Sequence, residues 1–253
     1  HCFSGETEVL TQSGVFKISE LSRIGHAELY VKTYDGMCWL DCQVKSFGEQ
    51  TIYPVNFGDG TSCRTTAGHR WLVSSKGKVN IRRTVDLHEG KSELLLAEVP
   101  LPEIDWTGYA AGFIYGDGNV RVSQGTGKRT SGVVLYGNDV DLLPVLRKHG
   151  NVGKIKYRKS HVVEGKQVEY GPVEYLPTVN GLPESWKQLP ETPTRDYAFG
   201  FVLGLMAADG CASKSQFNIY QANLEALTQV RRLAIWSGLR CGPIRLARKF
   251  SPF

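Results

Sequence analysis

The sequence predicts a multi-domain fold in which an all-β domain precedes an α+β domain built from a repeated unit. The first observation is that residues 1–98 form short alternating segments separated by glycine-containing turns, as in sheet proteins. The second is that one helical pattern bearing glycine and aspartate occurs twice within residues 106–253. The third is a proline-containing stretch between them, residues 99–105, which is typical of a linker.

Charge divides the chain in the same way. The 253 residues have an ordinary globular composition, with 41% hydrophobic and 22% charged residues. Residues 1–105 contain 11 Lys or Arg and 14 Asp or Glu, a net charge of −3, whereas residues 106–253 contain 19 and 11, a net charge of +8. A basic second region beside an acidic first one indicates that only the second binds a polyanion.

The lengths of the apolar runs and the spacing of the cysteines indicate in which cellular compartment the protein is expected. The longest apolar runs, near Ala110 and Phe199, are too short to span a bilayer, and the sequence has no secretory signal pattern. The six cysteines include no CxxC pair, and Cys38 and Cys42 are not followed by a second pair at zinc-finger spacing. We therefore expect a reduced, cytoplasmic protein that contacts no membrane.

The first region is expected to be a curled sheet structure with little helix. Glycine-containing turns are expected at Ser13-Gly14, Asp35-Gly36 and 58–60, and a short helical pattern covers Ile18–Leu21. The segments expected as strands are 9–11, 16–18, 28–34 and 51–57.

Two patterns in this region carry chemistry. Cys2 stands near the start of the sequence, and Thr66 and His69 form a T-x-x-H pattern after a segment expected to be a strand. A thiolate can attack a carbonyl while an imidazole protonates the nitrogen that leaves. The alternative is that Cys2 is an ordinary terminal residue and His69 a satisfied histidine of a sheet.

Together the two patterns resemble the N-terminal splicing blocks of inteins, whose Hint fold is shared with hedgehog autoprocessing domains. The likeness covers roughly residues 2–98, with both blocks in order and at a suitable separation. The residues that carry it are Cys2, Thr7–Val9, Gly14 and Ile18–Leu21 for the first block, and Thr66 and His69 for the second.

The resemblance to inteins implies a reaction and its residues. Cys2 would perform an N-to-S acyl shift on the His1–Cys2 peptide bond, and the host (extein) protein would precede it. Thr66 and His69 would hold that bond, with His69 assisting departure of the amide nitrogen. This chemistry needs no cofactor.

The repeated pattern of the second region places a small residue at every fourth position and ends in Asp-Gly. On a helix these residues share one face, so two such helices can approach backbone to backbone and bring their terminal acids side by side. We also expect Asp105 to cap the first helix. The members are Gly108, Gly112, Gly116 and Asp117 in the first copy, and Gly200, Gly204, Ala208 and Asp209 in the second.

The terminal acids need a compensating group. An acid at a helix C-terminus opposes the helix dipole and costs roughly 0.3–1 kcal/mol. Two adjacent carboxylates are tolerated only with a raised pKa or a divalent cation, and a cation would suit phosphodiester hydrolysis. The glycine that follows Asp209, Gly210, is suited to the left-handed position after a helix. The alternative for one copy alone is a plain buried helix.

The same order of elements follows each copy, although the second is shorter. After Gly118 we expect strands at 120–124 and 131–136, a helix at 138–149, a hairpin of 152–163 with 167–176, and a helix near 183–189. After Gly210 we expect a hairpin at 211–221, a helix at 223–237 and a basic strand at 240–250.

The stretches AAGFIYGDG and VLGLMAADG resemble the doubled motif of LAGLIDADG homing endonucleases, and the αββαββα order agrees. Residues 106–190 would be repeat 1, and residues 191–253 an incomplete repeat 2. The resemblance implies that Asp117 and Asp209 are catalytic and coordinate Mg²⁺ during double-strand DNA cleavage. Main-chain carbonyls of Gly116 and Ala208 would contribute further ligands.

DNA contact is expected from the sheets, because a two-stranded ribbon fits the major groove. Any one of these cations alone could be a solvated surface residue, and Lys154, Lys156, Lys159 or Lys214 could polarise the attacking water. The residues expected to contact double-stranded DNA are Lys128, Arg129, Lys154, Lys156, Arg158, Arg240, Arg245 and Arg248.

No C-terminal splicing block ending in His-Asn occurs in these residues. We therefore expect the N-terminal fragment of a split or truncated intein, with a C-terminal intein fragment as the partner that completes splicing. Two alternatives stay open: a DNA endonuclease that has lost splicing, and a non-cleaving DNA-binding module that keeps the repeat scaffold.

Overall fold

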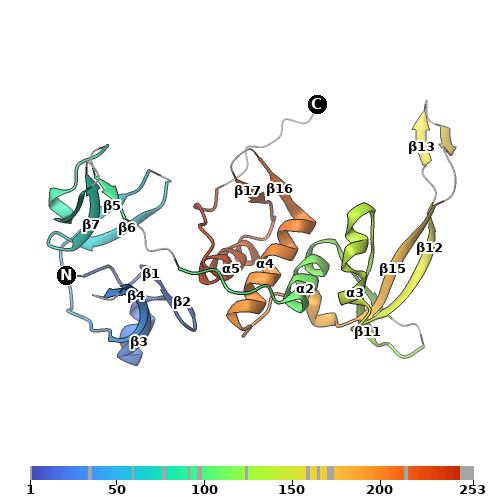
Figure 1. Cartoon of the computed structure of the whole chain (residues 1–253), viewed down its shortest axis with the longest axis horizontal. Coiled ribbons are helices and arrows are strands. Elements are labelled where there is room, and N and C mark those ends of the chain that lie inside the picture. The colour runs from blue at the N-terminus through green and yellow to red at the C-terminus, as the bar shows by residue number, and fades with distance from the viewer. Residues whose placement is uncertain are drawn as a thin grey trace. The chain divides into compact units, whose positions relative to one another are not determined.

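The structure is a computed structural model in which the chain divides into two compact units, His1–Leu101 with Arg231–Phe253, and Pro102–Val230 (Figure 1). The first change of unit lies within the expected linker 99–105. The structure describes residues 2–33, 36–58, 60–75, 78–90, 92–95, 99–122, 125–157, 160–163, 166–169, 174–213 and 216–245.

The first unit is built mainly from short antiparallel strands. One sheet has the order β2-β1-β3-β4 and consists of β1 (Glu8–Thr11), β2 (Gly14–Lys17), β3 (His26–Thr33) and β4 (Gly36–Gln43). A second pairs β5 (Ile52–Asn56) with β6 (Ser62–Thr66), and a third has the order β8-β7-β9, from β7 (Arg70–Ser75), β8 (Lys78–Arg83) and β9 (Glu93–Leu94). The helices are α1 (Ile18–Ile24) and the 3-10 helix η1 (Thr84–Asp86). The strands and the short helix expected within residues 9–57 are confirmed, with strand ends that differ by at most two residues and a helix that continues three residues further, to Ile24.

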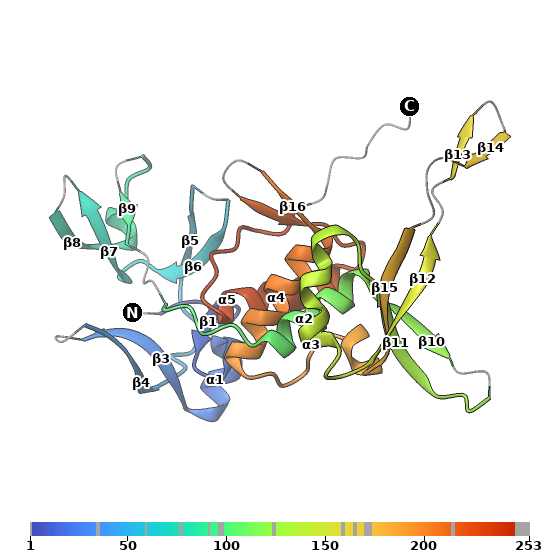
Figure 2. The ribbon, with the colours of Figure 1, turned by 45° about the vertical axis from the view of Figure 1, so that its right-hand side comes forward.

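The second unit is built around two long helices, α2 (Trp106–Asp117) and α4 (Arg195–Asp209). Its four-stranded sheet has the order β10-β11-β15-β12, from β10 (Asn119–Val122), β11 (Arg129–Val134), β12 (Asn151–Tyr157) and β15 (Glu174–Leu182). Two hairpins pair β13 (Ser160–Val163) with β14 (Lys166–Glu169) and β16 (Gly210–Ala212) with β17 (Phe217–Ile219) (Figure 2). The remaining helices are η2 (Gly137–Leu142), α3 (Leu143–Leu146), η3 (Glu184–Lys187) and α5 (Leu224–Trp236).

Helices α2 and α4 pack backbone to backbone, as the small-residue spacing predicts. A Cβ atom added to Gly112 would lie less than 3.0 Å from the main chain of Phe201, and one added to Gly204 would lie equally close to the main chain of Tyr109. No side chain fits in that space, so glycine is required at both positions. The two helices lie side by side in Figures 1 and 2. The predicted cap of α2 is also confirmed, because Asp105 Oδ1 accepts the Thr107 N–H at 2.7 Å.

The glycines that end these helices are not left-handed, which corrects the sequence prediction for Gly210. Gly118 has φ −73° and ψ 163°, and Gly210 has φ −80° and ψ 148°, so both are extended. Glycine is required at both positions because a side chain would not fit. A Cβ on Gly118 or Gly210 would lie within 3.0 Å of the main chain of the preceding turn, at Ile114 or Met206 respectively.

Three other elements differ from the sequence prediction. The expected helix 138–149 is a 3-10 helix followed by the short α3, because Pro144 lacks an N–H and is tolerated only in the first turn of a helix. The expected helix near 183–189 is the four-residue 3-10 helix η3. In the expected strand 240–250, the described residues 240–245 form no strand.

The chain from Arg231 onward groups with the first unit, whereas the sequence prediction placed 191–253 in repeat 2. Contacts with the β1–β2 hairpin account for this. Arg232 donates from Nε and Nη2 to Glu8 Oε1 at 2.9 and 2.7 Å, and the Trp236 ring nitrogen donates to a main-chain carbonyl of the β1–β2 turn at 3.1 Å. Among the described residues, no helix combines the length and the apolar character needed to cross a membrane.

Candidate functional site

The first candidate site lies where the segment beginning at Cys2 runs along β6. The Cys2 N–H donates to Thr66 Oγ1 at 3.1 Å, and the Thr66 N–H donates back to the Cys2 carbonyl at 2.9 Å. The segment continues in register, since the Ser4 N–H donates to the Arg64 carbonyl at 2.8 Å. The nitrogen that an acyl shift at Cys2 would release is therefore bound to the hydroxyl of the predicted threonine.

His69 completes this site from the turn after β6. Its N–H donates to the Thr66 carbonyl at 3.0 Å, and its ring packs against the rings of both Phe3 and Trp71, at centroid distances of 4.2 and 4.8 Å. Burial lowers the pKa of His69 below its ordinary value, and the positive amino terminus adds to this effect. His69 Nδ1 is buried and has no hydrogen-bond partner among the described residues. A lowered pKa favours the neutral imidazole, which is the form that can accept a proton.

Two buried threonines, Thr65 and Thr84, lie close to His69, and sequence reasoning did not predict their role. The hydroxyls of Thr65 and Thr84 are 2.8 Å apart, and the Trp71 Nε1–H donates to Thr84 Oγ1 at 3.0 Å. The Thr84 N–H donates to the His69 carbonyl at 2.9 Å. Thr84 has no local motif, because its role arises only when β8, the strand before it, pairs with β7.

The second candidate site lies at the C-terminal ends of α2 and α4. Asp117 and Asp209 are both exposed there, and a Cβ added to Gly116 would lie 3.0 Å from Asp209 Oδ2. Partial burial raises the pKa of Asp117, and the negative charges of Asp209 and Asp139 raise it further, while Lys187 opposes the shift. The two acids therefore act on each other electrostatically, as neighbouring like charges do.

Lys187 belongs to this site and was missed by sequence reasoning. Its Nζ donates to the carbonyls of Tyr115, Ile114 and Gly116 at 2.5, 3.2 and 3.4 Å, in the last turn of α2, where helix carbonyls lack part of their intrahelical partners. Burial lowers the pKa of Lys187, and the charges of Asp209 and Asp117 oppose that shift. No local pattern marks this lysine, because its partners lie 71 to 73 residues earlier in the chain.

These residues fit a divalent cation through two carboxylates. Asp117 and Asp209 supply the hard oxygen ligands that Mg²⁺ prefers. The Gly116 carbonyl, expected from the resemblance to be a ligand, faces the Lys187 ammonium instead, and Ala208 is half-buried in α4. Within the described ranges no group of three or more His, Cys, Asp or Glu gathers closely enough to hold a metal. Water or substrate oxygens would have to complete the coordination.

The expected DNA-contacting cations are spread over both units. In the second unit Lys154 and Lys156 are exposed and share one side of β12, and Lys128 is exposed before β11. Arg129 is paired with Glu184, at 2.7 Å from Nε to Oε1. The exposed Arg240 and Arg245 group with the first unit. The remaining cations named above, Arg158, Lys159, Lys214 and Arg248, lie outside the described residues.

No protein-family model and no curated protein sequence matches the chain.

The depressed pKa of His69 can be tested by an NMR titration of the histidine rings. The midpoint of His69 should lie below the ordinary value of about 6.5. Phe3→Ala, which uncovers one face of the ring, should move it upward. Between the lowered midpoint and about pH 6.5 the unfolded chain binds more protons, so the free energy of unfolding rises with pH in that interval. A wild-type midpoint at or above 6.5 contradicts this account.

Proposed function

We propose that the chain is an intein-type N-terminal fragment that performs an acyl shift at Cys2 and carries a LAGLIDADG-type DNA endonuclease. The observation that carries the first activity is the reciprocal pair of hydrogen bonds between Cys2 and Thr66. These bonds hold the scissile amide on Thr66, whose carbonyl accepts the N–H of the half-buried His69. The observation that supports the second is the pairing of Asp117 with Asp209 beside Lys187.

In the acyl shift, Cys2 Sγ attacks the carbonyl carbon of the preceding residue. A C–S bond forms, the C–N bond breaks, and the proton of the thiol is in effect transferred to the released nitrogen. His69 is suited to that transfer, because a neutral imidazole can accept the first proton and then donate one to the amine. Thr66 fixes the orientation of the amide, which makes the attack intramolecular and pre-oriented.

For DNA hydrolysis, Asp117 and Asp209 would hold Mg²⁺, which when bound would neutralise charge on the phosphate and acidify a water molecule. Lys187 keeps positive charge at the end of α2, where it stabilises the two acids. Lys154 and Lys156 would bind phosphates of the DNA backbone, a contribution that does not depend on sequence and weakens with salt.

The acyl shift is tested by fusing a reporter protein before His1 and adding an excess of a small thiol. The wild-type chain should release the reporter, and Cys2→Ala should release none. His69→Ala and Thr66→Ala should slow release, by roughly 10²–10⁴-fold for the loss of acid–base help from His69. Equal release from the wild type and from Cys2→Ala would exclude the reaction.

Endonuclease activity is tested on a library of DNA duplexes with and without Mg²⁺. Cleavage should require Mg²⁺ and should be lost in Asp117→Asn and in Asp209→Asn, while DNA binding persists in both variants. Lys154→Ala should weaken binding to all sequences alike and reduce its dependence on salt.

Two results would revise the assignment of the second unit. Cleavage that survives both aspartate substitutions would remove these acids from the mechanism. Tight DNA binding by the wild type with no cleavage under any condition would favour the non-cleaving DNA-binding module.

A further inference from the structure

Strand β8 forms one edge of the β8-β7-β9 sheet, and in the described residues no strand pairs with its outer side. It reads Lys-Val-Asn-Ile-Arg-Arg, so polar and apolar residues alternate from Lys78 to Arg82. An unpaired edge of this kind presents main-chain N–H and C=O groups to which another extended chain can bind.

The hydrogen bonds of the sheet determine which main-chain groups of β8 face outward. The Thr84 N–H donates to the His69 carbonyl, and in an antiparallel ladder every second residue faces the same neighbour. Lys78, Asn80 and Arg82 therefore face β7, and Val79 and Ile81 direct their N–H and C=O groups to the open edge. Strand β7 shows the same alternation, since the Leu72 carbonyl accepts from Leu95 on its other side.

One face of this edge is apolar and exposed. Val79 and Ile81 are each 62% exposed, and Leu72, which pairs with Ile81, is 40% exposed. Val85, next along the chain, is 52% exposed. These four side chains are the apolar face of the β8 edge.

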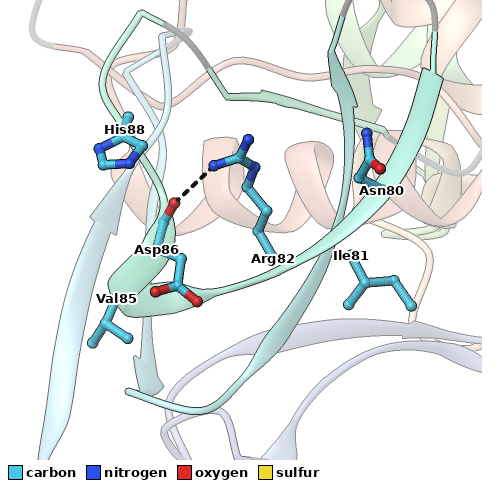
Figure 3. A pocket seen from close by; sticks show the side chains of 6 residues that line it. All are labelled: Asn80, Ile81, Arg82, Val85, Asp86 and His88. Carbon is cyan, nitrogen blue, oxygen red and sulfur yellow. Dashed lines mark hydrogen bonds between the residues drawn. The ribbon is translucent and has the colours of Figure 1, made fainter.

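The other face is cationic. An open hollow of about 580 Å³ lies beside β8 and is lined by Asn80, Arg82, Asp86 and His88, and also by Ile81 and Val85. Figure 3 shows Asn80 and Arg82 extending from β8 to this side, with His88 across from them and Ile81 directed away. Arg82 Nη1 donates to the Asp86 carbonyl at 3.5 Å. The Asp86 carboxylate also lines the hollow, but Arg83 Nε binds it at 2.8 Å, so it does not cancel the charge of Arg82.

We propose that β8 binds an extended segment of another protein in which apolar and acidic residues alternate. Such a segment would add a strand to the sheet, with its apolar side chains on the apolar face and its acidic side chains near Lys78 and Arg82. A second copy of this chain is a poor occupant, because β8 carries three cations and no acid and would repel itself. The site uses none of the residues proposed for the two reactions.

Binding is tested by fluorescence anisotropy with a labelled Glu-Val repeat peptide and the whole chain. The peptide should bind saturably and more weakly as salt rises. Ile81→Pro removes an outward N–H without disturbing the pairing with β7, and should weaken binding about tenfold or more. Arg82→Glu should weaken it to a similar extent, whereas the same charge change on a separate loop, Lys45→Glu, should alter it less than about twofold.

Three controls decide the interpretation. Circular dichroism shows whether each variant retains its fold, and amide NMR shifts in wild type should centre on Val79 and Ile81. A Lys-Val repeat peptide should bind at least about tenfold more weakly than the Glu-Val peptide. The proposal is overturned if the Glu-Val peptide fails to bind, if folded Ile81→Pro binds it unchanged, or if the chain instead dimerises through β8.

Discussion

The close contact between α2 and α4 is the constraint on which the second unit depends. At Gly112 and Gly204 the main chain of one helix occupies the space that a side chain would need on the other. Only glycine allows that approach, and the approach brings the two helix ends together. The pKa of Asp117 is raised there by partial burial and then by the charge of Asp209, and Lys187 donates to the carbonyls of the last turn of α2.

Both candidate sites place their reactive groups by main-chain contacts and set their charge by burial. In the first unit, hydrogen bonds along β6 position Cys2, and burial between aromatic rings lowers the pKa of His69. In the second, helix packing positions the acids, and partial burial with a like charge raises the pKa of Asp117. The opposite directions suit opposite roles, because a neutral imidazole can accept a proton and a bound cation would stabilise the charged form of neighbouring carboxylates.

The sequence predicted those features that depend on local spacing. Glycine at every fourth position defines a smooth helix face wherever that helix lies, so the α2–α4 contact was foreseeable, as was the cap at Asp105. Lys187 and Thr84 were not, because each acquires its role from partners brought near only by the fold. Gly118 and Gly210 show a further limit: a glycine required for space and one required for a left-handed turn look alike in a sequence.

The central claim is that glycines without side chains allow α2 and α4 to pack backbone to backbone. It is tested most directly at Gly112. Hydrogen exchange of amides in α2 and α4 measures the opening free energy of this unit. Gly112→Ala should lower that free energy by about 2 kcal/mol or more through overpacking. Gly125→Ala, where a Cβ would meet nothing within 4 Å, should change it by less than about 0.5 kcal/mol. If Gly112→Ala instead raised it by about 1 kcal/mol, as helix propensity alone would predict, the helices would not be in backbone contact.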